Sequence, residues 1–165
     1  MSTTYTKFII EAEKHFSTIQ QKHPSSFQCA PRCTQCCESG LTTLPIEAQN
    51  IRTYIQDNPD ILEALRTHTI VPDKCDFLST KGDCYIYPVR PFICRSHGAP
   101  IAIAEKDYFH IDVCPLNFTE NPIEELPPED FFILDAWNEV LLNFDSITDV
   151  PAQRVPLTLT NLLPS

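Results

Sequence analysis

Four cysteines lie within nine residues in the first quarter of the chain, and this spacing constrains the fold and the chemistry most strongly. They follow the pattern C-x3-C-x2-C-C, and four more widely spaced cysteines follow. Eight thiols in 165 residues indicate either a disulfide framework or metal ligation, and the redox compartment decides between the two. The eight residues are Cys29, Cys33, Cys36, Cys37, Cys75, Cys84, Cys94 and Cys114.

The N-terminal residues favour a reducing compartment. They lack the basic segment and apolar stretch of a secretory signal, so we expect a cytoplasmic protein with reduced thiols. Buried thiols acting as small apolar residues are a further alternative, but four thiols in nine loop residues are not typical of a core. We therefore expect metal ligation. Thiolates select zinc or iron–sulfur clusters and not magnesium or calcium.

Composition excludes several classes of partner. Lysine and arginine number 12 against 22 aspartates and glutamates, which gives a net charge of −10. This charge argues against nucleic acid and against an anionic membrane surface, and no apolar run is long enough to span a bilayer. Only three glycines are present, so a glycine-rich nucleotide cradle is excluded. The expected partner is a metal ion, and any protein partner or small substrate stays unidentified.

Hydrophobic periodicity predicts helices on both sides of the cysteines. Residues 4–22 carry an apolar stripe from Tyr5 to Ile19, and residues 44–56 carry a second stripe, with Thr42 or Thr43 as the helix cap. A short helix is expected after Asn58, and another from about 128 to 143. Trp137 falls on the stripe of that last helix, so we interpret it as a core residue.

Short β-hairpins are predicted between these helices. Residues 75–78 and 84–87 flank a glycine-containing turn, and residues 101–104 and 108–113 flank the turn Glu-Lys-Asp at 105–107. One helical turn is expected to start at Pro91. The sequence therefore predicts a small α+β fold, in which helices flank a cysteine-ligated metal centre with short β-hairpins. We expect a single domain over 1–165, with its cysteine core at 29–114 and a C-terminal helix and tail at 117–165, the tail packing on the core or on a second copy.

All eight cysteines are candidate metal ligands. They fit two four-thiolate sites, or one cluster with spare cysteines. Neighbouring side chains diverge in extended backbone, so Cys36 and Cys37 can reach two metals or two corners of one cluster. Arg90, Arg95 and His97 are candidates for supporting the ligands, because cationic donors offset thiolate charge. The arginines could equally bind an anionic substrate or a carboxylate, and His97 could serve as a ligand or a proton donor.

The cysteine segments resemble a known family. The resemblance rests on the first four cysteines, on Cys75-Asp-Phe-Leu, and on Cys84-Tyr-Ile-Tyr-x2-Arg90-Pro91-x2-Cys94-Arg95. These motifs resemble the YkgJ-type cysteine-cluster proteins, a zinc- or iron-chelating domain named for its CxxCxxCC motif. Three residues separate Cys29 from Cys33 here, where the family motif has two. The resemblance implies a small, mostly bacterial, cytoplasmic metal-binding domain.

Three functions follow as alternatives. The first is a binding or structural module with one or two zinc ions. The second is an iron–sulfur protein with redox or methyl-transfer activity, since a related domain occurs in flagellin lysine methylases, where an Fe–S cluster and S-adenosylmethionine are implicated. The third is metal storage or delivery. The spacing of Cys29, Cys33 and Cys36 also matches the C-x3-C-x2-C triad of radical S-adenosylmethionine enzymes, whose usual barrel is much larger than 165 residues. Whether the protein is an enzyme stays open.

Overall fold

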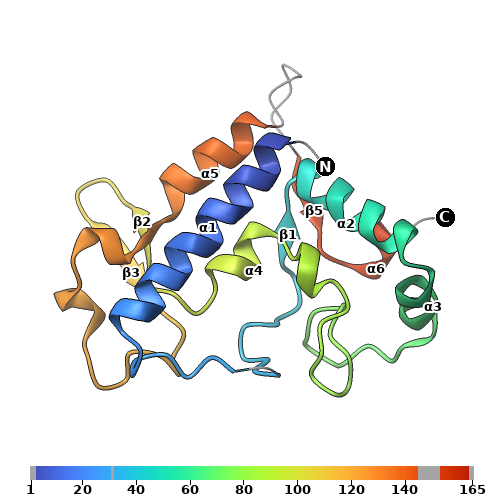
Figure 1. Cartoon of the computed structure of the whole chain (residues 1–165), viewed down its shortest axis with the longest axis horizontal. Coiled ribbons are helices and arrows are strands. Elements are labelled where there is room, and N and C mark those ends of the chain that lie inside the picture. The colour runs from blue at the N-terminus through green and yellow to red at the C-terminus, as the bar shows by residue number, and fades with distance from the viewer. Residues whose placement is uncertain (1–2, 31, 145–152, 164–165) are drawn as a thin grey trace. The chain divides into compact units, whose positions relative to one another are not determined.

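The chain folds into two units, and each unit combines segments that are distant in sequence. The computed structural model describes residues 3–30, 32–144 and 153–163 (Figure 1). One unit comprises Met1–Ala30 and Arg95–Phe144, and the other comprises Pro31–Cys94 and Asp145–Ser165. Helices and short strands in both units confirm the α+β prediction. The single domain expected over 1–165 stays a prediction.

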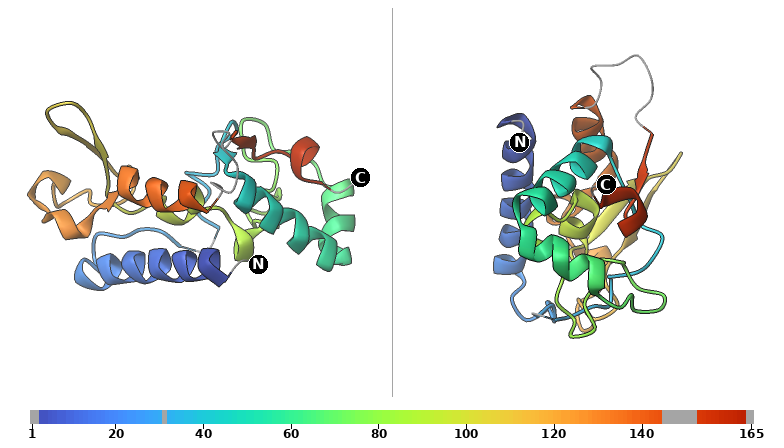
Figure 2. Two further views of the ribbon diagram at one scale, coloured as in Figure 1. Left: turned by 90° about the horizontal axis from the view of Figure 1, so that it is seen from above. Right: turned by 90° about the vertical axis from the view of Figure 1, so that its right-hand side faces the viewer.

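Two long helices form the body of the first unit. Helix α1 (Thr3–Lys22) confirms the first predicted helix, and α5 (Leu134–Asn143) lies along it (Figures 1 and 2). The Phe8 ring meets the Trp137 ring edge-on with 5.5 Å between centroids, so Trp137 packs in the core as predicted. The side chains that α1 buries belong to its predicted apolar stripe: Tyr5, Phe8, Ala12 and Ile19.

A three-stranded sheet packs with these helices in the order β3-β2-β4. The predicted second hairpin is confirmed as β2 (Ile101–Ala104) and β3 (Phe109–Asp112), paired antiparallel with Ala102 opposite Ile111. Strand β4 (Phe132–Ile133) pairs parallel with β2. The predicted start of the last helix at 128 is therefore wrong. Residues Pro128–Asp130 form a 3-10 helix, and the backbone then extends because Phe132 N–H donates to Pro100 O at 2.9 Å and its ring is fully buried.

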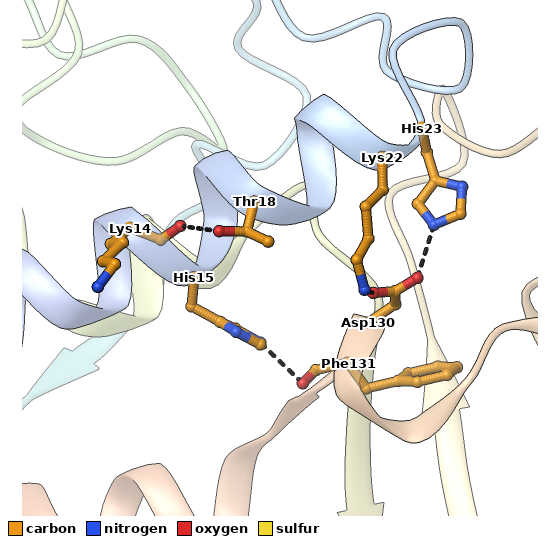
Figure 3. Close-up of polar contacts among 7 residues, drawn as sticks. All are labelled: Lys14, His15, Thr18, Lys22, His23, Asp130 and Phe131. Atoms are coloured by element: carbon orange, nitrogen blue, oxygen red, sulfur yellow. Dashed lines mark hydrogen bonds and ion pairs between the residues drawn. The ribbon is translucent and has the colours of Figure 1, made fainter.

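A buried carboxylate ties the end of α1 to this 3-10 helix (Figure 3). Lys22 Nζ donates to Asp130 Oδ1 at 2.5 Å, and His23 Nε2 lies 2.7 Å from Asp130 Oδ2. His15 Nε2 donates to the carbonyl oxygen of Phe131 at 3.0 Å. These contacts fix the point at which the chain leaves α1 and enters the first cysteine segment. Apart from the 3-10 helix Ile123–Glu125, residues 113–127 contain no regular helix or strand.

Three helices and a two-stranded sheet form the second unit. Helices α2 (Pro45–Asp57) and α3 (Pro59–Thr67) confirm the predicted pair, although the cap of α2 is Leu44 and neither threonine. Strand β1 (Thr42–Thr43) pairs antiparallel with β5 (Val155–Pro156), and α6 (Leu159–Leu162) lies near α2 and α3 (Figure 2). The tail therefore packs on the core of its own chain, where Leu157 and Leu162 are buried.

The prediction of two regular strands in the first hairpin is wrong. Residues 75–78 and 84–87 share one isolated antiparallel bridge, between Leu78 and Cys84. The chain then turns through a 3-10 helix, Tyr87–Val89, and through α4 (Phe92–Ser96), which confirms the predicted helical turn after Pro91. The second segment turns because Tyr87 N–H donates to Cys84 O at 3.2 Å and Val89 N–H donates to Ile86 O at 2.9 Å. No helix among the described residues combines the length and apolarity that crossing a membrane requires.

Candidate metal centre

The first cysteine segment runs beside the chain around Cys75 in the second unit. Cys75 N–H donates to the carbonyl oxygen of Cys37 at 3.1 Å, and Glu38 forms an antiparallel bridge with Lys74. Lys74 Nζ donates to Thr34 O at 3.2 Å. Backbone bonds therefore bring Cys37 and Cys75 together, although 37 residues separate them in sequence.

A tight turn carries Cys84 back to the same place. Ser79 N–H donates to Asp83 O at 2.8 Å, and Ser79 Oγ accepts the N–H of Asp83 at 3.0 Å. Gly82 has φ +84° in this turn, a conformation that residues with a Cβ rarely adopt. Because Leu78 bridges Cys84 and its own N–H donates to Cys75 O at 2.9 Å, Cys84 returns next to Cys75.

Cys94 lies in the first turn of α4. Its N–H donates to Pro91 O at 2.9 Å, and the preceding Phe92 N–H donates to the buried carboxylate of Glu47 at 2.7 Å. Cys75, Cys84 and Cys94 all pack against the hydrophobic core of the second unit, which includes Phe77 and Ile86. The same core therefore supports three thiols from two separate segments.

Five thiols of the second unit act on one another electrostatically, and we call them the thiol cluster: Cys36, Cys37, Cys75, Cys84 and Cys94. Burial raises the pKa of Cys84 to about 11, and Cys75 adds to that shift. Burial also raises the pKa of Cys94, with additions from Cys75 and Cys84. The pKa of Cys75 is raised chiefly by burial. Without a cation, these buried thiols therefore stay protonated at neutral pH.

Cys36 and Cys37 face the same cluster. The thiol of Cys36 hydrogen-bonds to Cys37 and lowers the pKa of Cys37, against the opposing effects of burial and of Cys84. Cys36 in turn raises the pKa of Cys94. The divergence expected for an extended backbone is absent here because residues 34–37 form a turn, in which Cys37 N–H donates to Thr34 O at 3.1 Å. We expected Cys36 and Cys37 to reach either two metals or two corners of one cluster, and these contacts favour one shared centre.

The donor set of the cluster fits a soft or borderline metal. Thiolates are the ligands that zinc and iron–sulfur clusters take, and a bound cation would offset the burial that chiefly keeps these thiols protonated. None of the eight cysteines forms a disulfide. Over residues 3–30, 32–144 and 153–163, no three histidine, cysteine, aspartate or glutamate side chains already stand in a coordinating arrangement. Side-chain rotation of the clustered cysteines would have to complete any site.

The remaining three cysteines have different surroundings. Cys33 lies in the second unit and is partly exposed. Cys29 and Cys114 belong to the first unit, where Asn117 gathers both segments. Asn117 Nδ2 donates to Cys29 Sγ at 3.2 Å and to Gly98 O at 2.6 Å, and Asn117 N–H donates to Cys114 O at 2.8 Å.

Gly98 makes room for the Cys29 thiol. An added Cβ at Gly98 would lie 2.9 Å from Cys29 Sγ, and Gly98 has φ +97°. Only glycine fits this position without displacing the sulfur. The exposed Cys29 thiol is therefore held by a buried amide and by a close backbone approach, both within the first unit.

The three predicted supporting residues differ in their contacts. Arg90 lies near the cluster: its charge lowers the pKa of Cys84, and its guanidinium lies 4.1 Å from the centre of the Tyr87 ring. Arg95 is buried and forms an ion pair with Glu13 on α1. His97 Nδ1 is buried and has no hydrogen-bond partner among the described residues. Arg90 therefore acts on a thiol of the cluster.

Two residues that support the cysteines were not singled out from the sequence. Glu47 accepts hydrogen bonds beside Cys94, and Asn117 holds Cys29. A signal for Glu47 was present, because a glutamate at the third position of a helix commonly reaches back to the N-terminal backbone. No comparable signal marks Asn117, since its partners lie 19 and 88 residues away in the chain.

Comparison with known families agrees with the donor set. Residues 28–115 match the CxxCxxCC family, described as a "Putative zinc- or iron-chelating domain". The match covers more than half of the chain, and the protein belongs to this family. It confirms the resemblance to the cysteine-cluster proteins. Neither the curated proteins nor the solved structures include a match.

Proposed function

We propose that the protein is a metal-binding module whose thiol cluster holds zinc, and that the metal fastens the cysteine segments of the second unit to one another. The observation that carries this proposal is the convergence of Cys36, Cys37, Cys75, Cys84 and Cys94 from separate segments into one electrostatically coupled group. Membership of a zinc- or iron-chelating family supports the class of ligand. The proposed compartment is the cytoplasm, where thiols stay reduced.

The local structure around the cluster favours a stabilising role for the metal. Segments 32–39 and 73–84 contain turns and isolated bridges and no regular strand or helix. Segment 32–39 contains no fully buried side chain, and segment 73–84 buries only Phe77 and Leu78, so both segments depend on links between them. A four-thiolate zinc site is closed, contributes its binding energy to folding and is usually structural.

Charge is the second support for a cation at this place. Four thiolates around one divalent ion keep a formal charge of −2, which nearby cationic donors offset. Arg90 supplies such a charge, because it already lowers the pKa of Cys84. In this proposal Arg90 stabilises the ligand set, and Cys33 is an additional ligand in the second unit. Cys29 and Cys114 stay candidate ligands in the first unit. Arg95 and His97 stay candidates for supporting roles in the first unit.

Iron is the alternative that the family description also names. The cluster contains five thiols, one more than a single zinc or a four-iron cluster requires. Four of these thiols would suffice for an iron–sulfur centre in a redox or methyl-transfer enzyme. The fifth suits a storage or delivery protein that exchanges metal between ligand sets. The metal in the purified protein distinguishes the iron–sulfur enzyme from the zinc module.

Metal removal tests the proposed role directly. A chelator should strip the metal and increase amide hydrogen exchange in segments 32–39 and 73–94, while exchange in α1 changes little. Re-addition of zinc should restore protection. If the stripped protein keeps full protection over 73–94, the fastening role is wrong. A variant with Cys84→Ser should resemble the stripped protein. The matched control is Thr80→Ala, which changes an exposed residue of the same turn and keeps every thiol.

A further inference from the structure

Glu47 is a buried charged residue that joins three elements of the second unit. Its side chain is 3% exposed. Oε2 accepts the hydroxyl of Thr43 at 2.7 Å and the N–H of Leu44 at 3.0 Å, and Oε1 accepts the N–H of Phe92 at 2.7 Å. One carboxylate therefore links β1, the start of α2 and the start of α4.

The contact with Phe92 concerns the helix that carries Cys94. Helix α4 has five residues, and so short a helix is not stable by itself in water. The first N–H groups of a helix have no acceptor within that helix, and a buried N–H without an acceptor destabilises the fold. Phe92 is buried, so Glu47 supplies the acceptor that solvent cannot supply. This bond fixes the turn two residues before Cys94.

The three donors to Glu47 also explain why a carboxylate stands here. Both oxygens accept hydrogen bonds, from one hydroxyl and two backbone N–H groups. A glutamine has one acceptor oxygen, so its amide N–H groups would face the donors on the other side. The carboxylate charge lies near enough to the Cys94 thiol to act on it. A metal cation at that thiol would be attracted by the same charge.

We propose that Glu47 is a positioning residue for Cys94, holding α4 so that the Cys94 thiol joins the cluster. The proposal rests on the proposed metal-binding function for its biological meaning. The geometric part concerns the metal-free protein and is tested without any metal. Loss of the carboxylate should loosen the Cys94 segment while Cys75, which is held by its own backbone bond to Cys37, keeps its place.

The first experiment measures how fast each cysteine of the metal-free protein reacts with an alkylating reagent, read peptide by peptide by mass spectrometry. In Glu47→Gln the reaction of Cys94 should become about tenfold faster relative to that of Cys75, as expected for easier local opening. The matched control is Thr43→Val, which removes one donor to Glu47 and leaves its bond to Phe92. In that control the ratio should stay within about twofold of the wild type.

An unchanged ratio in Glu47→Gln would overturn the proposal, and so would an equal acceleration at Cys75 and Cys94, which indicates general loosening. Should the glutamine variant not fold, Glu47→Asp serves in its place. Its side chain is one methylene shorter and cannot reach Leu44 and Phe92 together. The same rise in the ratio is expected, and an unchanged ratio again overturns the proposal.

The second experiment measures zinc affinity by competition with a chromophoric chelator. Loss of a residue that supports a ligand typically weakens metal binding about 10- to 100-fold, and we expect this loss in Glu47→Gln but not in Thr43→Val. Equal affinity in Glu47→Gln and wild type would contradict a role in metal binding. If the wild type binds neither zinc nor iron, the proposed function fails, while the alkylation ratio still decides whether Glu47 positions Cys94.

Discussion

His23 and Asp130 meet at the end of α1, where His23 Nε2 lies 2.7 Å from Oδ2 of the buried Asp130 carboxylate (Figure 3). Lys22 donates to the other oxygen. Burial by itself would raise the pKa of Asp130, but the hydrogen bonds from Lys22 and His23 outweigh burial and hold that pKa below its ordinary value. The ionised carboxylate therefore stabilises the folded first unit.

Replacing Asp130 should make the protein less stable at neutral pH. Because the folded pKa is lowered, the stabilisation is present above the unfolded pKa of about 3.9 and is lost as the pH falls through the folded pKa. Asp130→Asn should reduce the free energy of unfolding by about 1.5–3 kcal/mol at pH 7, the range for hydrogen bonds to a charged group. Urea unfolding at pH 7 and pH 3 measures both effects.

The matched control for that variant is Glu129→Gln, which removes an exposed neighbouring carboxylate. Its stability should stay near that of the wild type. Equal stability of Asp130→Asn and wild type at pH 7 would show that the buried ion pair does not hold α1.

The metal-free protein should lose stability in alkali. Burial raises the pKa of Cys84 to about 11, whereas an unfolded thiol has a pKa of about 8.5. A raised pKa gives stability that is complete below about pH 8.5 and is lost as the pH rises toward 11. Unfolding of metal-free protein between pH 8 and pH 11 should show this decline, and Cys84→Ala should show a smaller one. A flat profile in the wild type would contradict the burial of protonated thiols.

Zinc binding should become stronger in alkali, where the metal-free protein becomes less stable. Thiols must lose their protons to bind a metal, so zinc affinity should rise with pH and binding should release protons. Calorimetry in two buffers of different ionisation enthalpy counts the released protons. Zinc binding without proton release would mean that the ligands are not the buried thiols.

Asn117 should hold Cys29 in place. The Asn117 side chain is 2% exposed, and it bonds Gly98 O, Cys29 Sγ and the N–H of Gln28. Asn117→Ala leaves these groups without their partner and should reduce the free energy of unfolding by about 1–3 kcal/mol, with faster alkylation of Cys29.

Gly98→Ala should also displace Cys29, because the added Cβ would lie 2.9 Å from its sulfur. Gly40→Ala is the control, since nothing lies within 4 Å of an added Cβ there, although its φ is also positive.

If Gly98→Ala and Gly40→Ala change the reactivity of Cys29 equally, the close approach at Gly98 has no effect on that thiol. The proposed role of Gly98 in placing the Cys29 thiol would then be wrong.

Local patterns predicted the helices well and the cysteine segments poorly. The apolar spacing from Tyr5 to Ile19 is complete within α1 itself, so periodicity was sufficient. At Phe132, pairing with β2 and burial of the ring outweigh the helical pattern, and neither is visible in the local sequence. The cysteines were recognisable by residue type as candidate metal ligands. Their grouping depends on bonds such as Cys75 N–H to Cys37 O, which join distant segments.

The clustered thiols are the proposed ligands of the metal. The most direct measurement is metal content with visible absorption, on protein purified without oxygen and without metal-affinity resin. We expect zinc near one or two ions per chain with no visible band, loss of that zinc in Cys84→Ser and Cys94→Ser, and full retention in His97→Ala. Iron with acid-labile sulfide and a brown band would favour the iron–sulfur protein over the zinc module. Full metal retention in both serine variants, or a wild type without zinc or iron, would contradict metal binding by the thiol cluster.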